Sequence, residues 1–368
     1  MKKADILLAL FVVVMLAACA RDGEMIVNTS QEVVPTNMPP ELHLTYAHST
    51  ASTRAGSDIQ ATQFANGEQV DVFMQDATDN CIIYTKPITY TADGSGRLTY
   101  DDSDNRLYWP KLLHALEIYG VYPSGSVAEG KKILGDFNPF TYTTDYSFTV
   151  AADQTTEADY KASDLMIGFP SSPSPNVVPC TLYQDGDEGT VNLNFVHRLS
   201  KIVVTLEPAS NVAEEGSIGQ VTADDLAYTG PEDTKYARVT LSSINRKISF
   251  KVYDASSDLG TAEKPTDSDP QTVVSRGSDI AFIVPPQTIP VGTFITIDLI
   301  TKSGNTETVD ETFTYALTAN LDLAAKNVYT YNITLTKPQV TVTVNDITAW
   351  TSAGETTSGN AGLVQPTN

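Results

Sequence analysis

Apolar and polar residues alternate along most of this chain, and turn-forming residues separate the alternating runs. Alternation with a period of two places apolar side chains on one face of a β-strand. Valine, isoleucine, threonine and tyrosine fill the runs, as is typical of strands. The clearest runs are residues 98–100, 116–122, 146–150, 191–195, 202–206, 248–252, 280–284, 295–299, 313–317, 329–335 and 340–344. About a dozen strands of this kind predict an all-β protein built from sandwiches rather than a βαβ fold.

The alternation changes phase near the middle of the chain. Within residues 191–195 the apolar positions carry odd numbers, whereas within 202–206 they carry even numbers. Because a slip of one residue moves every side chain to the other face, we expect a bulge or bend within residues 197–201. Helical spacing is confined to residues 110–116 and 319–326, for which we expect single turns or short helices at most.

Composition suggests where one unit ends and the next begins. Residues 169–179 are rich in proline and serine, and an Asp/Gly turn follows them, so we place a boundary near residue 185. We predict one sandwich at residues 41–185 and a second at residues 186–350. The last residues, 351–368, are rich in glycine, serine and threonine without periodicity, and we expect a polar tail there.

The N-terminal residues are typical of an exported lipoprotein. Two lysines precede an apolar stretch, residues 6–18, which is too short for a comfortable membrane span and has the size of a signal-peptide core. The stretch ends in the letters LAAC, and small residues before a cysteine are what bacterial lipoprotein signal peptidase requires. The alternative is an ordinary signal peptide with an incidental cysteine, but the spacing and the residue order favour lipidation. We expect residues 1–18 to be removed, Cys19 to carry the lipid, and residues 19–40 to tether the first strand to the membrane.

The net charge disfavours one class of partner, and the number of cysteines limits the disulfide bonds that the chain can form. The formal net charge of −22 repels phosphate backbones and anionic lipid headgroups, so we expect no nucleic-acid partner. Only Cys81 and Cys180 remain beyond the lipidation site. Two cysteines in so long a chain are no disulfide framework, and either a bond between them or two buried thiols fits the sequence.

No catalytic motif emerges from the sequence. His43 and His48 lack the i, i+2 spacing that would place two ligands on one strand face, and His114 and His197 stand alone. The acidic clusters at residues 101–104 and 185–188 lack the glycine and distal glutamate of an EF-hand loop. Nucleophile elbows, zinc-protease motifs and phosphate-binding loops are absent from the sequence. We therefore expect a binding or structural protein that is not an enzyme and that has no metal site and no cofactor.

Several landmarks, in order, resemble the fimbrillin family of lipoproteins, the subunits of the type V pilus of Bacteroidales. Beside the lipidation motif at Cys19 they are STRAG around Arg54, YWP at 108–110, LEIYGVYPS at 116–124, VNLNFVHRLSKIVVTLEP at 191–208, VYTYNITLT at 328–336 and VTVTVNDITAW at 340–350. The resemblance implies two tandem transthyretin-like Greek-key β-sandwich domains. It also implies lipidation, export through the periplasm to the outer-membrane surface, and assembly with other pilus subunits by strand exchange.

In that family an arginine-specific protease removes the N-terminal strand and so opens a groove for a neighbour's segment. The resemblance therefore implies cleavage between Arg54 and Ala55, with the first strand at residues 41–54 removed. The surrounding residues 49–57 are small and offer no bulk that would keep the chain out of a protease cleft. A surface arginine in an ordinary loop is the alternative.

The C-terminal tail departs from the pattern of stalk subunits, in which an apolar donor strand follows the tryptophan motif. In residues 351–368 only Leu363 and Val364 are strongly apolar. We therefore favour a tip or minor accessory subunit, with a host or bacterial surface molecule as a ligand. The alternative is a lipid-anchored surface protein that binds glycans, which would need an exposed aromatic platform. A third reading, an exported glycosidase, would need a carboxylate pair that nothing in the sequence singles out.

Overall fold

The computed structural model confirms an all-β chain, with two very short helices among the residues that it describes. It describes residues 41–46, 64–76, 81–82, 88–100, 115–125, 146–170, 181–183, 190–208, 221–250, 261–263, 271–336 and 339–349. Cys19, Arg54, the tail and both tryptophans lie outside these residues. No helix within the described residues is long and apolar enough to cross a membrane.

The first half of the chain forms a sheet that closes on itself. In spatial order its strands are β3 (Cys81–Ile82), β2 (Gln69–Asp76), β4 (Ile88–Ala92), β5 (Arg97–Thr99), β1 (Glu41–Tyr46), β10 (Thr190–His197), β8 (Met166–Pro170), β6 (Ala115–Tyr122) and β9 (Thr181–Tyr183). Because β2 also pairs with β6, the strands β2, β4, β5, β1, β10, β8 and β6 form a closed ring. The interior holds an apolar core that includes Val72, Tyr90, Ile118, Leu193 and Phe195.

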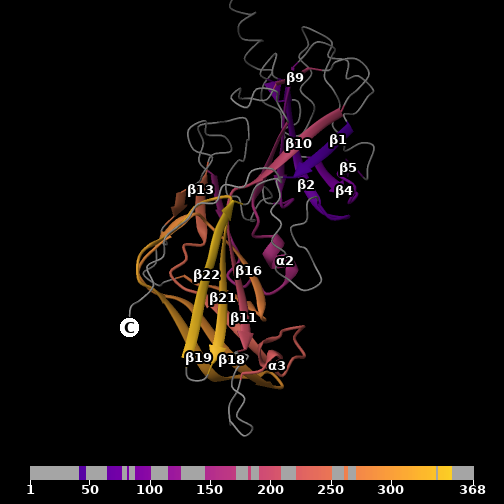
Figure 1. Cartoon of the computed structure of the whole chain (residues 1–368). Helices are drawn as coiled ribbons and strands as arrows, with labels where there is room; N and C mark the ends of the chain where they lie inside the picture. Colours follow the sequence, from indigo (N-terminus) through magenta and orange to yellow (C-terminus); the bar gives the residue numbers. More distant parts are fainter. Residues whose placement is uncertain are drawn as a thin grey trace, which may run out of the picture.

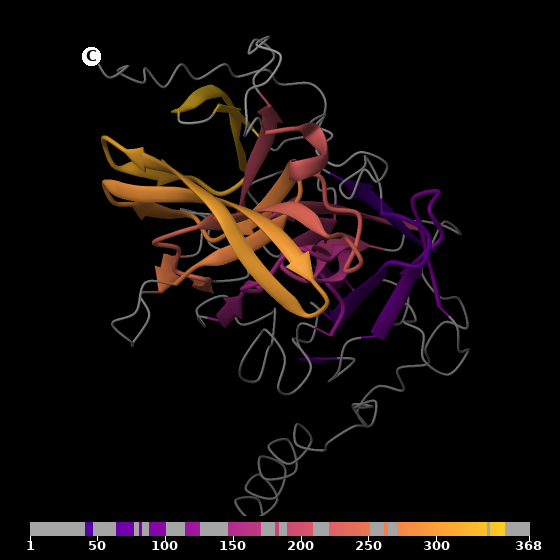
Figure 2. The same cartoon turned by 90° about the horizontal axis from the view of Figure 1, so that it is seen from below.

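The second half contains two four-stranded sheets packed on a larger core, at the lower end of Figure 1. One sheet has the order β16 (Asp279–Val284), β11 (Ser200–Pro208), β21 (Asn327–Thr336), β22 (Gln339–Ala349). The other has the order β15 (Val273–Arg276), β12 (Lys235–Leu241), β18 (Gly292–Ser303), β19 (Thr306–Leu317), and its long final hairpin is prominent in Figure 2. Apolar residues alternate inward along these strands, as the sequence pattern predicts.

Shorter elements complete the described structure. A small sheet joins β14 (Thr261–Glu263), β13 (Lys247–Phe250) and β7 (Tyr146–Thr149), and β17 (Gln287–Ile289) pairs with β20 (Leu321–Leu323). The two helices are α2 (Glu157–Lys161) and α3 (Ala223–Leu226), and each is N-capped by a threonine, Thr156 and Thr222. Residues 319–326 form β20 and a turn without a helix, within the limit of a single turn or short helix that the sequence set.

The predicted bend within residues 197–201 is confirmed, and it carries the chain from one half to the other. Strand β10 ends at His197 and β11 begins at Ser200. The two residues between them are held by neighbouring backbone, since the Arg198 N–H donates to the Leu165 carbonyl at 2.9 Å and the Lys326 N–H donates to the Leu199 carbonyl at 2.9 Å. A single run of residues therefore supplies a central strand to each half.

The expected boundary at residue 185 does not coincide with this change of sheet. Strand β10, which we placed in the second sandwich, pairs with β1 and β8 of the ring. Strand β7, which we placed in the first, pairs with β13 of the second half. A shared apolar cluster with members from both halves, including Phe73, Leu199 and Ile283, lies between them. The division into two tandem sandwiches thus stays a prediction, while the two halves are joined by pairing and by a common core.

Candidate assembly site

A single cut in the chain would separate strand β1 from the rest of the ring. It lies between β10, to which it is parallel, and β5, to which it is antiparallel (Figure 1). The next described residue after Tyr46 is Phe64, so β1 reaches the rest of the ring through residues 47–63 alone. Without β1, the strands β10 and β5 would face an open gap in an otherwise closed sheet.

The register matches β1 to the best-buried part of β10. Leu42 and Leu44 pair with Val191 and Leu193, and Tyr46 pairs with Phe195. All three of these β10 side chains are buried. On its other side, Leu42 pairs with the buried Leu98 of β5. The apolar positions of β1 therefore align with a row of core residues, and a gap at β1 would expose the edge of that core.

Phe195 is fixed in this row by two glycines. A Cβ atom on Gly120 would lie 2.3 Å from the Phe195 ring, and one on Gly168 would lie 2.6 Å from it. The two glycines pair with each other across β6 and β8, so the ring of Phe195 lies over a site where neither strand has a side chain. Phe64 contacts the same ring edge-on, with ring centroids 5.1 Å apart. An isolated glycine within an alternating run is the sequence signal for such a close approach.

The histidines and the cysteine that the structure describes fall in separate places. His43 lies in β1, and His197 is fully buried at the end of β10, with its Nδ1 atom 2.8 Å from Oδ1 of the buried Asp164. Cys81 lies in β3. Cys19, Arg54, Ala55, His48, His114, Cys180 and the acidic clusters at 101–104 and 185–188 lie outside the described residues. Among the described residues no group of histidine, cysteine and carboxylate side chains could hold a metal ion.

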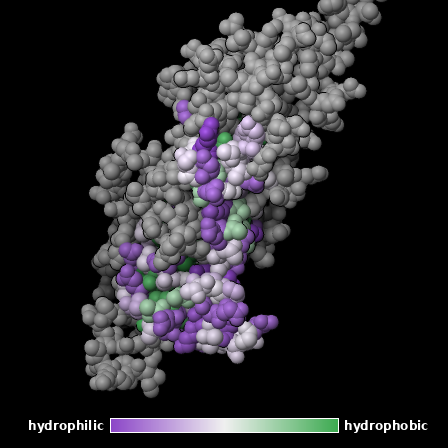
Figure 3. Space-filling view, turned by 90° about the vertical axis from the view of Figure 1, so that its right-hand side faces the viewer, coloured by the Kyte–Doolittle hydropathy of each residue, from purple (hydrophilic) through white to green (hydrophobic). Residues whose placement is uncertain are grey.

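Aromatic exposure bears on the glycan-binding alternative. Large apolar side chains are exposed at only two described positions, Val291 and Val309. Every described aromatic side chain is buried or half-buried. On the face shown in Figure 3, the described surface is mostly hydrophilic, with small apolar patches. Among the side chains whose burial the structure describes, none of the aromatic ones is fully exposed as a platform for stacking against sugars would require.

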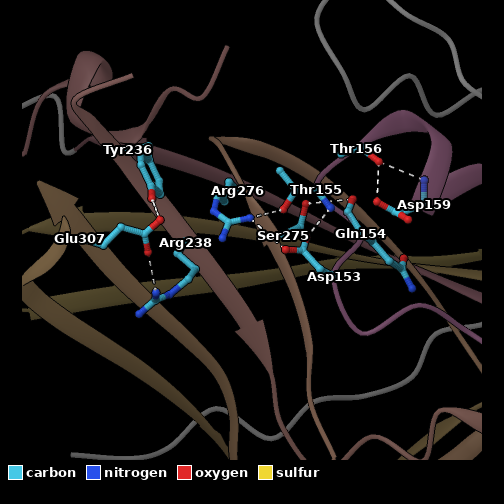
Figure 4. A network of polar contacts seen from close by, with 10 residues as sticks. All are labelled: Asp153, Gln154, Thr155, Thr156, Asp159, Tyr236, Arg238, Ser275, Arg276 and Glu307. Atoms are coloured by element: carbon cyan, nitrogen blue, oxygen red, sulfur yellow. Dashed lines mark hydrogen bonds and ion pairs between the residues drawn. The ribbon is translucent and has the colours of Figure 1, made fainter. Parts of the chain in front are cut away.

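A polar network that sequence reasoning missed crosses the outside of the second half (Figure 4). Arg276 donates through Nη1 to Asp153 Oδ2 at 3.0 Å and lies over the ring of Tyr236, 6.0 Å from its centroid. The Tyr236 hydroxyl donates to Glu307, which Arg238 also contacts. Burial raises the pKa of the Asp153 carboxyl, but hydrogen bonds from Thr155 and the pairing with Arg276 outweigh it and hold that pKa below its usual value. This carboxylate therefore stays ionised and keeps residues from the two halves together.

The comparisons with known proteins identify the family to which the chain belongs. The model of the fimbrillin-like family matches residues 53–350, so the chain belongs to the fimbrillin-like family. The resemblance drawn from the sequence motifs is confirmed. None of the curated proteins compared with the chain matches it.

Solved structures with TM-scores above 0.5 share the fold. A proposed cell adhesion protein from Bacteroides ovatus is 15% identical with a TM-score of 0.54, over 86% of this chain and 99% of that one. A second proposed cell adhesion protein, from Bacteroides uniformis, is 18% identical with a TM-score of 0.51, over 85% of this chain and 99% of that one. A fimbrial protein from Bacteroides vulgatus has a TM-score of 0.43 at 14% identity, over 85% of this chain and 100% of that one. The family defines a pilus-type structural protein of the cell surface.

We expect Gly120→Ala to destabilise the ring by about 1–3 kcal/mol, because the added methyl group overlaps the Phe195 ring in a packed core. The free energy of unfolding, measured by chemical denaturation, is the readout. Gly230→Ala is the matched control, since a Cβ atom there meets nothing within 4 Å, and we expect a change within about 0.5 kcal/mol. Equal losses in the two variants would contradict the proposed packing at Phe195.

Proposed function

We propose that this chain is made as a lipid-anchored precursor and becomes a pilus subunit when proteolysis releases its first strand and a neighbour's segment replaces it. The observation that carries the proposal is the position of β1, which closes the ring between β10 and β5 and pairs with a row of buried residues. Membership of the fimbrillin-like family supports assembly with other pilus subunits.

Strand replacement provides enough free energy to hold two subunits together. A donated strand in the place of β1 would restore backbone hydrogen bonds to β10 and β5, at roughly 1 kcal/mol each. It would also bury about three apolar side chains over the exposed row, at roughly 1.5–3 kcal/mol each. Joining of this kind needs no covalent link. Until cleavage, β1 covers the row and keeps the precursor from pairing indiscriminately.

The position of Arg54 in the sequence supports its proposed role in this step. It follows β1 and precedes Phe64, so cutting between Arg54 and Ala55 would separate β1 from all other strands of the ring. Cys19 lies upstream of β1, so the same cut would release the lipid together with the strand. One proteolytic event would thus free the subunit from the outer membrane and open its groove.

The proposed cut predicts a change in the N-terminus between membrane and fibre. Membrane-bound precursor should begin at lipidated Cys19, and fibre-borne protein should begin at Ala55, as read by N-terminal sequencing and intact mass. Arg54→Ala should keep the chain in the membrane fraction and out of sheared fibres. Arg21→Ala removes an arginine upstream of β1 and should assemble as wild type does.

Fibre-borne wild type that still begins at Cys19 would contradict the proposed cut and would make the chain an anchor or a surface binding protein. Cys19→Ala provides the second control, because it should abolish lipid labelling without changing the sequence around Arg54.

We further propose a place at the tip, or as a minor accessory subunit, with a ligand on a host or bacterial surface. The support is the polarity of residues 351–368, which offer few apolar side chains to fill a neighbour's groove. Immunogold labelling of intact fibres should place the chain at fibre ends. Labelling along the shaft would contradict the proposal and would make the chain a stalk subunit.

A further inference from the structure

One side of the second half is bordered by two sheet edges that lie next to each other. Strand β15 is an edge strand of one sheet and β16 is an edge strand of the other. The turn at Gly277 and Ser278 joins them directly, so both edges belong to the same side of the sandwich. An edge strand presents backbone groups that can pair with a strand from another chain.

A short segment from the first half lies over both edges. This cover segment, residues 151–155, follows β7 and leads into α2, which lies beside β16 (Figure 1). On the β15 side it pairs through its backbone. The Gln154 N–H donates to the Val274 carbonyl at 2.8 Å, the Val274 N–H donates to the Ala152 carbonyl at 2.8 Å, and Asp153 forms a parallel bridge with Val274. Ser275 adds a hydrogen bond from its hydroxyl to the Gln154 carbonyl at 3.3 Å.

On the β16 side the segment uses a side chain instead of its backbone. The Gln154 amide accepts from the Ile283 N–H through Oε1 at 2.8 Å and donates to the Ile283 carbonyl through Nε2 at 2.8 Å. A primary amide carries the same donor and acceptor as a peptide group, so it satisfies both backbone groups of Ile283 as a neighbouring strand would. Gln154 is fully buried, so water has no access to replace either bond.

The ends of the cover segment are held as well. Arg276 of β15 donates through Nη1 to Asp153 Oδ2 at 3.0 Å and to Thr155 Oγ1 at 2.9 Å (Figure 4). Thr156 then caps α2, since its Oγ1 accepts from the Asp159 N–H at 3.1 Å. The segment is therefore fixed at both sides of Gln154.

We propose that residues 151–155 act as a built-in edge cover, in which the Gln154 amide replaces a strand beside β16, so that the β15 and β16 side of the second half is closed to strand addition. The open edges of the two four-stranded sheets are then β19 and β22. Strand addition to the two four-stranded sheets is then confined to those edges. Which sheet edges take part in pilus assembly rests on the proposed function. The edge cover itself is already present in the uncleaved monomer.

The test removes the Gln154 amide in the full, uncleaved chain and follows Ile283. Gln154→Met keeps the side-chain volume and loses both hydrogen bonds. Native-state hydrogen exchange at the Ile283 amide should become about fivefold faster or more, as expected from the loss of a net hydrogen bond. The variant should also self-associate at concentrations at which the wild-type chain is monomeric by light scattering.

Gln287→Met is the matched control, because Gln287 makes the same two-point contact elsewhere. Its Oε1 accepts from the Asn245 N–H at 2.8 Å and its Nε2 donates to the Asn245 carbonyl at 3.1 Å, but this contact covers neither β15 nor β16. The control should speed exchange at Asn245, leave Ile283 unchanged and stay monomeric.

Gln154→Asn is a second variant, which keeps the polarity but withdraws the amide by one methylene group, and we expect the same two changes as in Gln154→Met. Unchanged exchange at Ile283 in both Gln154 variants would overturn the proposal. Faster exchange without self-association beyond that of the Gln287→Met control would overturn it too, because Gln154 would then only stabilise the fold.

Because the cover is tested in the uncleaved chain, failure of cleavage at Arg54 would leave this result unaffected, and the two proposals can fail separately.

Discussion

Backbone pairing along residues 190–208 is the constraint on which the rest of the structure depends. Strand β10 has β1 parallel on one side and β8 antiparallel on the other, and β11 has β21 parallel on one side and β16 antiparallel on the other. Parallel neighbours cannot be joined by a tight hairpin and come from distant parts of the chain. Strand β1 therefore enters the ring from the beginning of the sequence, with a single connection to the other described strands. A strand held in this way could leave the ring without unthreading the fold.

The junction between the halves would keep the proposed strand exchange local. Leu199 lies in the bend between β10 and β11 and belongs to the apolar cluster that both halves share. The cover segment adds hydrogen bonds from Gln154 to Ile283 and an ion pair from Asp153 to Arg276. These contacts lie in the second half and its junction and do not include β1. Opening the ring would thus change one wall of the first half while the second half keeps its shape.

The sequence predicts the strands better than it predicts how they are grouped. Alternation identifies β10, β11, β18 and β21, and its change of phase identifies the bend at Arg198 and Leu199, because burial on one face is a local constraint. The boundary near residue 185 is misplaced relative to the change of sheet, because a segment rich in proline indicates a loop but does not say which sheet the next strand joins. Strand β7 pairs with β13, a distant partner that no local pattern announces.

Prediction from the sequence is limited in the same way for the polar contacts. Gly120 and Gly168 could have been singled out as glycines within alternating runs, and Thr156 and Thr222 as helix caps. Gln154 and Arg276 could not, because their partners, Ile283 and Asp153, are far away in the sequence and neither residue belongs to a motif. The proposed sites at Cys19 and Arg54 rest on sequence patterns in residues outside the described structure, and only their order relative to β1 comes from the fold.

Hydrogen exchange in a chain cut at Arg54 and stripped of β1 tests the account most directly. With β1 removed, alternate amides of residues 190–195 should lose protection, while the amides of β11 from Lys201 to Glu207 should keep it. Addition of a synthetic peptide copying residues 41–46 should restore protection to β10. Protection in β10 that survives the loss of β1, or a loss that spreads through β11 as well, would contradict the claim that β1 is a replaceable closing strand.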